Sequence, residues 1–479
     1  MSKFYITTTL PYVNAEPHIG FAAEIIKADC IARWHRLNGD EVFFNTGTDE
    51  HGQKIYEKAK EAGIDTQKYC DEYAEKFRGL KDLLNLSVTN FIRTTDEYHV
   101  KAAQAFWKRC VANGDIYKKN YKIKYCVGCE LEKTDSELVN DCCPLHPDRK
   151  IELVDEENYF FRFSKYQKPL LELYEKNPEF VKPDWRFNEI WSFMKRGLED
   201  FSISRLKSKM PWGIPVPSDN EQVMYVWFDA LVNYISCLNW PENEAKFKEW
   251  WPGVQVCGKD NLRQQTAMWQ AMLMSAGLPT SKQVLVFGFI TANGQKMSKS
   301  SGNTVSPVDL VAKYGIDATR YFLLKEIKPF ADSDFSFEKM ETLYTADLAN
   351  GLGNLAARVS TLLEKNSLEV DLTTPVIDLA SEFVSKMDQY AFDEALAVLW
   401  AKITANDVIL TEKKPWKMKD KAEIKKVLEP IAQDILNIAF LLEPFMPATA
   451  QKLQKQFSEP QIKKGESLFP RLVVPSTAK

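Results

Sequence analysis

The chain has 479 residues, enough for roughly two to four domains, and its 45% hydrophobic and 27% charged residues are typical of a globular protein. The formal net charge of −4 excludes a uniformly basic nucleic-acid-binding protein, so any RNA contact must come from local patches. We find neither a signal-peptide pattern nor an apolar run long enough to span a membrane. The nine cysteines are mostly scattered, which predicts reduced thiols in a cytoplasmic protein.

The N-terminal residues predict an α/β fold that binds a nucleotide. Residues 4–9 are rich in β-branched and aromatic side chains, which predicts a strand, and residues 22–36 have the apolar spacing of a helix. The turn between them contains His18 and Gly20, and a helix N-terminus favours phosphate through its free N–H groups and its dipole. The alternation continues with a strand and a helix at 41–45 and 66–84. It predicts a parallel sheet with crossover helices.

The pattern changes between residues 116 and 221, where aromatic residues, cysteines and prolines crowd together and helical periodicity is poor. This change predicts an insertion into the nucleotide-binding fold. The α/β pattern then returns, with predicted strands at 224–227, 254–257 and 284–287.

A cysteine cluster within the predicted insertion indicates a metal site. Cys126 and Cys129 form one pair of soft ligands with two residues between them, and Cys143 and His146 form another. Two such pairs separated by a short loop suit tetrahedral, structural Zn²⁺. Choosing Cys143 over Cys142 rests on the equal spacing within each pair. The alternative is a chance cluster of reduced thiols.

A second segment that could take part in chemistry is Lys296-Met297-Ser298-Lys299, which glycines flank at 294 and 302. Such a loop can bring two ammonium groups onto a polyphosphate, since a lysine binds phosphate as a compact point charge. A solvated basic loop is the alternative.

From about residue 336 onward nearly every segment predicts an amphipathic helix, and together these predict a helical bundle. The predicted breaks lie at Gly351 and Gly353, at 373–375, at Pro415 and at Pro447. The lysine-rich stretch 413–426 is either an RNA-contacting patch or a solvated helix face.

Two motifs resemble the signatures of class I aminoacyl-tRNA synthetases. These are His18-Ile19-Gly20-Phe21, in which Phe21 replaces the usual final histidine, and the complete Lys-Met-Ser-Lys-Ser motif that begins at Lys296. Four further segments resemble the methionyl-tRNA synthetase family in its single zinc-knuckle form, and the resemblance covers nearly the whole chain. They are Thr46-Gly47-Thr48-Asp49-Glu50-His51-Gly52, Tyr225-Val226-Trp227-Phe228-Asp229-Ala230, Gly258-Lys259-Asp260 and Lys414-Pro415-Trp416.

The resemblance implies an α/β protein with a Rossmann-like parallel-sheet catalytic domain, an inserted zinc-binding connective domain and an all-α anticodon-binding bundle. The corresponding ranges are 1–115 with 222–290 for the catalytic domain, 116–221 for the connective domain, 291–335 for the Lys-Met-Ser-Lys-Ser loop and stem-contact region, and 336–479 for the helical domain.

The activity implied is that of a ligase in protein biosynthesis. It activates L-methionine with ATP to methionyl-adenylate and transfers methionine to the 3′ end of methionine tRNA, initiator and elongator alike. Mg²⁺ would accompany ATP, one structural Zn²⁺ would be bound, and no membrane would be involved. Some members of this family carry a further C-terminal domain that dimerises. Because the chain ends soon after the predicted bundle, we expect a monomer.

The resemblance also implies roles for individual residues. Asp49 would bind the substrate ammonium and Asp260 would contact the ribose. The implied catalytic residues are His18, Lys296 and Lys299. The implied ATP-binding residues are these three together with Asn14, Gly20, Gly258, Lys259 and Asp260. The implied methionine-binding residues are Leu10, Tyr12, Asp49, Trp227, Ala230 and Tyr234. The implied anticodon-binding residues are Asn354, Arg358 and Trp416. The implied zinc ligands are Cys126, Cys129, Cys143 and His146.

A second departure from the family pattern is Gln265, which stands where the family usually has a histidine a few residues after Gly-Lys-Asp. Glutamine donates and accepts hydrogen bonds but carries no charge. Phe21 and Gln265 support one alternative, a degenerate synthetase that binds tRNA without activating methionine. A further alternative, independent of these two residues, is a different nucleotidyl transferase on the same fold.

Overall fold

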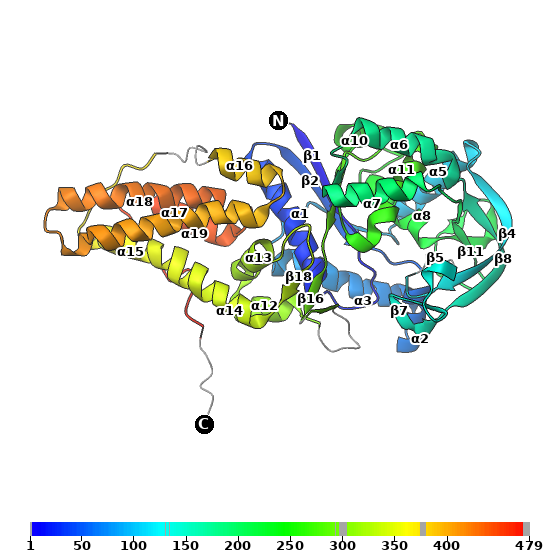
Figure 1. Ribbon diagram of the computed structural model, residues 1–479, viewed down its shortest axis with the longest axis horizontal. Coiled ribbons are helices and arrows are strands. Elements are labelled where there is room, and N and C mark those ends of the chain that lie inside the picture. Colours follow the sequence, from blue (N-terminus) through cyan, green and yellow to red (C-terminus); the bar gives the residue numbers. More distant parts are fainter. Residues whose placement is uncertain are drawn as a thin grey trace, which may run out of the picture. The chain divides into compact units, whose positions relative to one another are not determined.

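The structure is a computed structural model that describes residues 2–129, 131–133, 135–292, 294–296, 304–373 and 380–472. The chain divides into two units, each assembled from separated stretches of sequence. Unit 1 comprises Met1–Pro17, Asp40–Leu80 and Val88–Phe287, and unit 2 comprises His18–Gly39, Lys81–Ser87 and Gly288–Lys479. Figure 1 shows the elements of both units in the colours of the sequence.

A six-stranded parallel sheet forms the centre of unit 1 and confirms the predicted α/β fold. Its order is β3 (Asn90–Arg93), β2 (Glu41–Thr48), β1 (Lys3–Thr8), β14 (Val254–Gly258), β15 (Gln283–Phe287) and β9 (Val181–Lys182). Strands of such sheets are buried on both faces, and five of the six residues of β1 are indeed buried. The strand order reverses between β1 and β14, and ligands of open α/β sheets bind at this kind of switch point.

Most of the predicted strands are confirmed, but the one at 224–227 is wrong. β13 (Asp219–Met224) ends at Met224, and α8 (Val226–Ala230) begins two residues later. The Phe228 and Asp229 N–H groups donate to the carbonyl of Tyr225, which closes the helical turn. A short apolar run does not distinguish a strand from a buried helical turn, which is the physical reason for the error.

The predicted insertion at 116–221 contains mostly antiparallel strands. One sheet is formed by β10 (Phe201–Ser202), β8 (Glu152–Phe161), β4 (Ile116–Cys126) and β5 (Leu131–Lys133), and the long β4 and β8 are labelled in Figure 1. Beside these lie a sheet of β11 (Ser204–Leu206), β13 and β12 (Pro215–Val216), and the pair β6 (Cys142–Cys143) and β7 (His146–Lys150). The same range also supplies β9, which pairs with β15 of the parallel sheet.

Helices complete unit 1. The predicted helix at 66–84 divides at Gly79 into α3 (Thr66–Arg78), which belongs to unit 1, and α4 (Leu80–Leu83), whose last three residues belong to unit 2. The others are α2 (Gln53–Ala62), α5 (Glu97–Ala112), α6 (Gln167–Lys176), α7 (Asp184–Lys195), α9 (Asn233–Ser236), α10 (Glu244–Trp250) and α11 (Trp269–Ser275).

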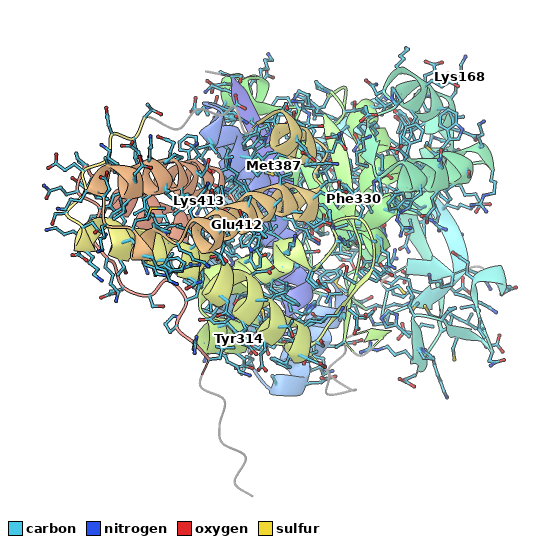
Figure 2. All side chains as sticks on the ribbon, turned by 60° about the vertical axis from the view of Figure 1, so that its left-hand side comes forward. Lys168, Tyr314, Phe330, Met387, Glu412 and Lys413 are labelled. Carbon is cyan, nitrogen blue, oxygen red and sulfur yellow. The ribbon has the colours of Figure 1, made fainter. Side chains whose placement is uncertain are left out.

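Unit 2 is predominantly helical, and its described residues from 336 onward are mostly helical, as predicted. Helices α15 (Asn354–Lys365), α17 (Phe392–Lys413), α18 (Lys421–Leu441) and α19 (Pro447–Phe457) run side by side in Figure 1, and the contacts between them agree. Glu412 and Lys413 mark the end of α17 in Figure 2. The unit also contains α1 (Ile19–Leu37), α12 (Pro307–Tyr314), α13 (Ile316–Lys325), α14 (Phe337–Leu343), α16 (Ala380–Asp388) and a sheet of β17 (Gln295–Lys296), β16 (Ile290–Ala292) and β18 (Ser333–Phe335).

The predicted break at Gly351 and Gly353 is wrong. Residues Tyr344–Gly353 form a π-helical segment that continues directly into α15. Glycine weakens a helix without terminating it, and burial of Leu348 and Leu352 favours the helical path here. The breaks at Pro415 and Pro447 are confirmed, while residues 374 and 375 lie outside the described residues.

A buried ion pair anchors α1 within unit 2. Arg320 Nη2 lies 2.8 Å from Asp29 Oδ2, and both side chains are fully buried. The same guanidinium donates to the carbonyls of Phe445 and Pro444, at 2.9 Å each. Burial would raise the pKa of Asp29, but the charges of Arg320 and Arg33 lower it, so the carboxylate remains ionised.

None of the helices that the structure describes combines the length and the apolar character needed to cross a lipid bilayer.

Candidate active site

The ends of β1 and β2 bring the first predicted methionine-binding residues together. The Asp49 N–H donates to the carbonyl of Pro11 at 3.0 Å, and the Val13 N–H donates to the carbonyl of Asp49 at 3.3 Å. Tyr12 and Asp49 thereby form a parallel bridge just beyond the paired strands. Asp49 is 3% exposed, so it presents a buried carboxylate at the carboxyl end of the sheet.

Three of the remaining predicted methionine-binding residues lie on α8 and α9 of the same unit, and the fourth, Leu10, follows β1. Tyr234 and Leu10 belong to one hydrophobic cluster, and Trp227 packs against it. Ala230 is buried at the end of α8. Among the described residues, the buried Trp227 Nε1 has no hydrogen-bond acceptor. The predicted methionine-binding surface therefore presents a polar N–H beside apolar side chains.

Gln265 is fixed against Tyr234. Its Nε2 donates to Tyr234 Oη at 2.6 Å, and its Oε1 accepts from Gln255 Nε2 at 3.1 Å. Gln265 is 1% exposed and lies in the π-helical segment Gln264–Met268, a kind of element frequent at functional sites. A neutral, hydrogen-bonded amide therefore occupies the position of the family histidine.

A carboxylate between two histidines ties α8 to the end of β2. Asp229 accepts from His51 Nδ1 at 2.9 Å and from His99 Nε2 at 3.1 Å, and His99 Nδ1 lies 2.9 Å from Ser236 Oγ. Burial would raise the pKa of Asp229, yet the charge of His51 and the hydrogen bonds from both imidazoles lower it. The network holds the helix that carries Trp227.

Three predicted ATP-binding residues follow the neighbouring strand. Gly258 is the last residue of β14, and Lys259–Asn261 form a 3₁₀ turn directly after it. Asp260 is exposed and Lys259 is half-buried. Because β14 and β1 flank the point of strand reversal, these side chains follow the edge at which nucleotides bind in such sheets.

The His18 turn belongs to unit 2. His18 caps α1, and its Nδ1 accepts from the Gly20 N–H at 3.0 Å. Because Nδ1 accepts, the proton of the neutral imidazole lies on Nε2, which makes Nε2 a donor. A Cβ on Gly20 would lie 2.8 Å from His18 Cε1, so glycine is needed for this ring position. Phe21 occupies the first turn of the helix and is half-buried.

The base of the lysine loop is a hairpin within unit 2. β17 pairs with β16, and Asp334 Oδ1 accepts from the Gly294 N–H and from Thr291 Oγ1, at 2.7 Å each. Lys296 closes β17. Lys299 and the rest of the loop lie outside the described residues.

The four predicted zinc ligands converge in unit 1. Their ligand atoms all lie within 4.8 Å of one another, and Cys142 is not part of the group. Cys129 Sγ lies 3.4 Å from Cys143 Sγ and 3.2 Å from His146 Nδ1. Bonds of about 2.0–2.3 Å to a tetrahedral Zn²⁺ require ligand atoms roughly 3.3–3.8 Å apart. These two separations lie close to this range, and three thiols with one imidazole are ligand types of tetrahedral zinc, so the donor set fits zinc.

Two of the three predicted anticodon-binding residues lie together in unit 2. The Arg358 guanidinium lies over the Trp416 ring, 5.4 Å from its centroid, and forms an ion pair with Asp407. Trp416 is 46% exposed. Asn354 is exposed one helical turn before Arg358 on α15, so both belong to the same helix face.

Sequence reasoning missed several polar residues of unit 1 that lie within or beside the predicted methionine-binding segments. Glu50, His51 and Asp229 stand inside the quoted motifs, where only Asp49, Trp227 and Ala230 received roles. Arg205 lies over the rings of Tyr125 and Tyr225 and, with Gly52, lines a cavity of unit 1. For Glu50, His51 and Asp229 the available signal was their position within the motifs, whereas Arg205 lies outside them. Their partners lie far away in sequence, as in the 178-residue separation of His51 and Asp229.

Comparisons with known proteins agree with this arrangement. The model for class I tRNA synthetases (M) matches residues 4–151 and 132–360. A methionine–tRNA ligase of Thermotoga maritima is 41% identical over 476 residues, covering 95% of this chain and 75% of that protein. One of Rhizobium meliloti is 43% identical over 474 residues, covering 94% and 91%.

Among solved structures, a Mycobacterium tuberculosis methionyl-tRNA synthetase in complex with methionyl-adenylate superposes with a TM-score of 0.89 at 35% identity. The match covers 100% of this chain and 99% of that one. Since both the family model and full-length relatives extend over most of its residues, the chain belongs to the methionine–tRNA ligase family of class I aminoacyl-tRNA synthetases.

Proposed function

We infer that the chain is an ATP-using ligase that activates L-methionine as methionyl-adenylate and transfers it to the 3′ end of methionine tRNA, the reaction of its family. The observation that carries this function is the bridge between Tyr12 and Asp49, which sets a buried carboxylate at the sheet edge in the unit that also holds Leu10, Trp227, Ala230 and Tyr234. A carboxylate and a hydrophobic, aromatic wall complement the ammonium and the thioether of methionine.

The first step requires no protein nucleophile. The methionine carboxylate attacks the α-phosphorus of ATP and pyrophosphate leaves, so the enzyme contributes positioning and stabilisation of phosphate charge. Asp49 holds the ammonium. His18 donates from Nε2 to a phosphate oxygen, and the N–H groups of the Gly20 turn add further donors.

Other residues complete ATP binding in this proposal. Lys296 and Lys299 supply positive charge to the departing pyrophosphate, and Mg²⁺ accompanies the triphosphate. Asp260 binds the ribose, while Asn14, Gly258 and Lys259 contribute to the nucleotide site.

Cys126, Cys129, Cys143 and His146 would hold one Zn²⁺. A closed set of four ligands makes the metal structural, and it would stabilise the fold of residues 116–221 without taking part in the reaction.

Unit 2 would read the anticodon. Trp416 presents an exposed ring on which a loop base can stack, and Arg358 and Asn354 offer donors to base edges. We propose the same anticodon recognition for initiator and elongator methionine tRNA. The proposed domains are the catalytic domain at 1–115 with 222–290, the connective domain at 116–221, the Lys-Met-Ser-Lys-Ser loop and stem-contact region at 291–335, and the helical domain at 336–479.

We further propose a cytoplasmic monomer. All nine cysteines lie within the described residues and none of them is paired in a disulfide, which suits a reducing compartment. A dimer mass at micromolar concentration would contradict the oligomeric state.

ATP–pyrophosphate exchange with and without L-methionine tests the function. We expect exchange that depends on methionine, followed by charging of methionine tRNA. A degenerate synthetase would bind tRNA without exchange, and a different nucleotidyl transferase would exchange without methionine.

A further inference from the structure

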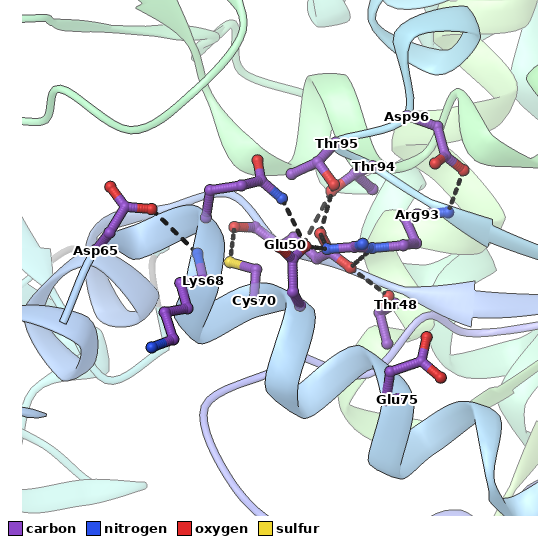
Figure 3. Close-up of polar contacts among 12 residues, drawn as sticks. Thr48, Glu50, Asp65, Lys68, Cys70, Glu75, Arg93, Thr94, Thr95 and Asp96 are labelled. Carbon is purple, nitrogen blue, oxygen red and sulfur yellow. Dashed lines mark hydrogen bonds and ion pairs between the residues drawn. The ribbon is translucent and has the colours of Figure 1, made fainter.

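We propose that Glu50 and Arg93 form a clamp that positions Asp49 for the ammonium of methionine, which makes Glu50 a positioning residue of this enzyme. The inference rests on the role proposed for Asp49. Glu50 follows Asp49 directly in sequence, and its carboxylate faces the end of β3 (Figure 3).

The Glu50 carboxylate is completely buried and has four hydrogen bonds. Oε1 accepts from Thr48 Oγ1 at 2.6 Å and from Arg93 Nε at 2.7 Å. Oε2 accepts from Arg93 Nη2 at 2.8 Å and from Thr95 Oγ1 at 2.5 Å. A bidentate arginine with two hydroxyl donors fixes both the plane and the position of the carboxylate.

The main chain of the segment is held from several directions. The Glu50 N–H donates to Thr94 Oγ1 at 2.9 Å, and the Glu50 carbonyl accepts from Trp212 Nε1 at 2.6 Å. The Asp49 main chain is bonded to Pro11 and Val13. Successive side chains of an extended segment point to opposite faces, so fixing the Glu50 carboxylate also fixes the face on which Asp49 projects.

Charge supports the same role. Two adjacent buried carboxylates would repel each other and compete for the substrate ammonium. Arg93 compensates the charge of Glu50, which leaves Asp49 as the carboxylate that serves methionine. Arg93 also reaches Asp71 on α3 through Nη2 at 2.6 Å, but the Asp71 side chain is 52% exposed. Because Asp71 binds the same guanidinium as Glu50 but is exposed, a substitution of Asp71 is a control for a substitution of Glu50.

Glu50→Gln tests the clamp in steady-state pyrophosphate exchange with the full-length protein. Losing a charge-assisted, bidentate contact should raise the KM for methionine by about 10–100-fold. The KM for ATP and kcat at saturating methionine should change by no more than about twofold, because the clamp acts on methionine binding. Asp71→Asn should leave all three parameters unchanged.

Milder variants keep the test valid if Glu50→Gln does not fold. Thr48→Val and Thr95→Val each remove a single hydrogen bond to Glu50 and should each raise the methionine KM by about 3–10-fold. Arg93→Lys retains the positive charge but loses the bidentate hydrogen bonding of the guanidinium. Its methionine KM should therefore lie between those of the wild type and Arg93→Met.

A double-mutant cycle separates this inference from the proposed function. If Glu50 acts through Asp49, Glu50→Gln should add little to the methionine KM once Asp49→Asn is present. An increase for Asp49→Asn but none for the Glu50, Thr48 or Thr95 variants would overturn the clamp and leave the function standing. An unchanged methionine KM in Asp49→Asn would instead refute the role of Asp49. Equal losses for methionine and ATP, or an Asp71→Asn effect as large as that of Glu50→Gln, would show a merely structural role and also overturn the clamp.

Discussion

Unit 1 and unit 2 each contain an arginine–carboxylate pair with a fully buried carboxylate, near a segment with a proposed role in catalysis. The two pairs have different structural roles. Glu50 and Arg93 join the ends of two strands in unit 1, directly beside Asp49. Asp29 and Arg320 join the middle of α1 to α13 in unit 2, eleven residues after His18. At 1.5 Å per residue that is roughly 16 Å along the helix.

The two pairs lie at different distances from the residues that they support: Glu50 is adjacent to Asp49, whereas Asp29 is several helical turns from His18. This difference explains how each site is organised. A helix transmits its orientation over several turns, so one ion pair sets the axis of α1, and the hydrogen bond from Gly20 to His18 sets the ring locally. Residues that follow parallel strands have no such rigid continuation. Each of them needs its own anchor, as Asp49, Glu50 and His51 have.

The largest effect should come from the zinc ligands of unit 1. Val139, Leu145 and Leu153 near the cluster are all more than half exposed, so this segment has little apolar core of its own. Structural zinc contributes about 10–16 kcal/mol in small zinc domains. Cys126→Ser should therefore release zinc and make residues 116–161 sensitive to limited proteolysis, while unit 2 remains resistant.

Metal content per chain measures this directly. Cys142→Ser is the matched control and should retain zinc, since Cys142 is not part of the ligand group. An active purified protein without bound zinc would refute the assignment.

The next largest effect separates phosphate stabilisation from methionine binding. Removing one well-placed donor to developing charge costs about 2.7–4 kcal/mol, so His18→Ala should lower kcat for pyrophosphate exchange by about 100–1,000-fold. Gly20→Ala should act in the same direction, because its Cβ would displace the imidazole. The Kd for methionine, measured by calorimetry without ATP, should remain unchanged in both variants because the predicted methionine residues belong to unit 1. His35→Ala, in the last turn of α1, is the control. Intact exchange in His18→Ala would make the degenerate synthetase the better interpretation.

A third test concerns a buried cation of unit 2. Burial lowers the pKa of Lys27 to about 7, although the charges of Glu24 and Asp393 raise it. Since the unfolded chain binds this proton up to about pH 10, the folded state gains stability as pH rises from about 7 to 10. Lys27→Met should therefore be more stable than the wild type by roughly 5 kcal/mol at pH 6, and the difference should vanish above about pH 10.

Chemical denaturation at several pH values measures the difference. The exposed Lys455→Met is the control and should show no such pH dependence. A constant difference between Lys27→Met and wild type from pH 6 to pH 10 would contradict the burial of a titrating lysine.

The sequence predicted those features of both units that depend on local patterns. Alternation of residue types located β1, β2, β14, β15 and α1, and equal spacing selected Cys143 over Cys142. It failed where a short apolar run has two possible conformations, as at Val226–Ala230, which is helical.

Long-range pairing explains the other omissions. Glu50 and Arg93 are 43 residues apart, and they meet only because β2 and β3 are neighbours in the parallel sheet. Nothing in the spacing of residues indicates which strands will be adjacent, so the clamp is visible only in the folded chain.

A smaller effect should distinguish RNA reading from adenylate chemistry. Stacking of one base on an aromatic ring contributes about 1–3 kcal/mol, so Trp416→Ala should lower kcat/KM for tRNA charging by about 5–150-fold. Pyrophosphate exchange should be unaffected. Trp185→Ala removes an exposed tryptophan of unit 1 and serves as the control. Equal losses in both assays would place Trp416 in the core of the fold instead.

The smallest expected effect tests the departure from the family motif at Phe21. Phenylalanine offers no hydrogen bond to phosphate, so the first turn of α1 lacks the side-chain donor that a histidine at this motif position would supply. Phe21→His restores it. In the proposed mechanism His18 and the backbone N–H groups already bind phosphate at this turn. We therefore expect Phe21→His to increase kcat for pyrophosphate exchange by about 2–10-fold, less than the effect of a donor that acts alone. The methionine KM should stay constant, because the predicted methionine residues lie in unit 1. Phe21→Leu separates hydrogen bonding from packing, since leucine also lacks a donor. Equal rate changes in the two variants would show that the position acts through packing. A decrease in Phe21→His alone would mean that the phenylalanine ring itself supports the turn that positions His18.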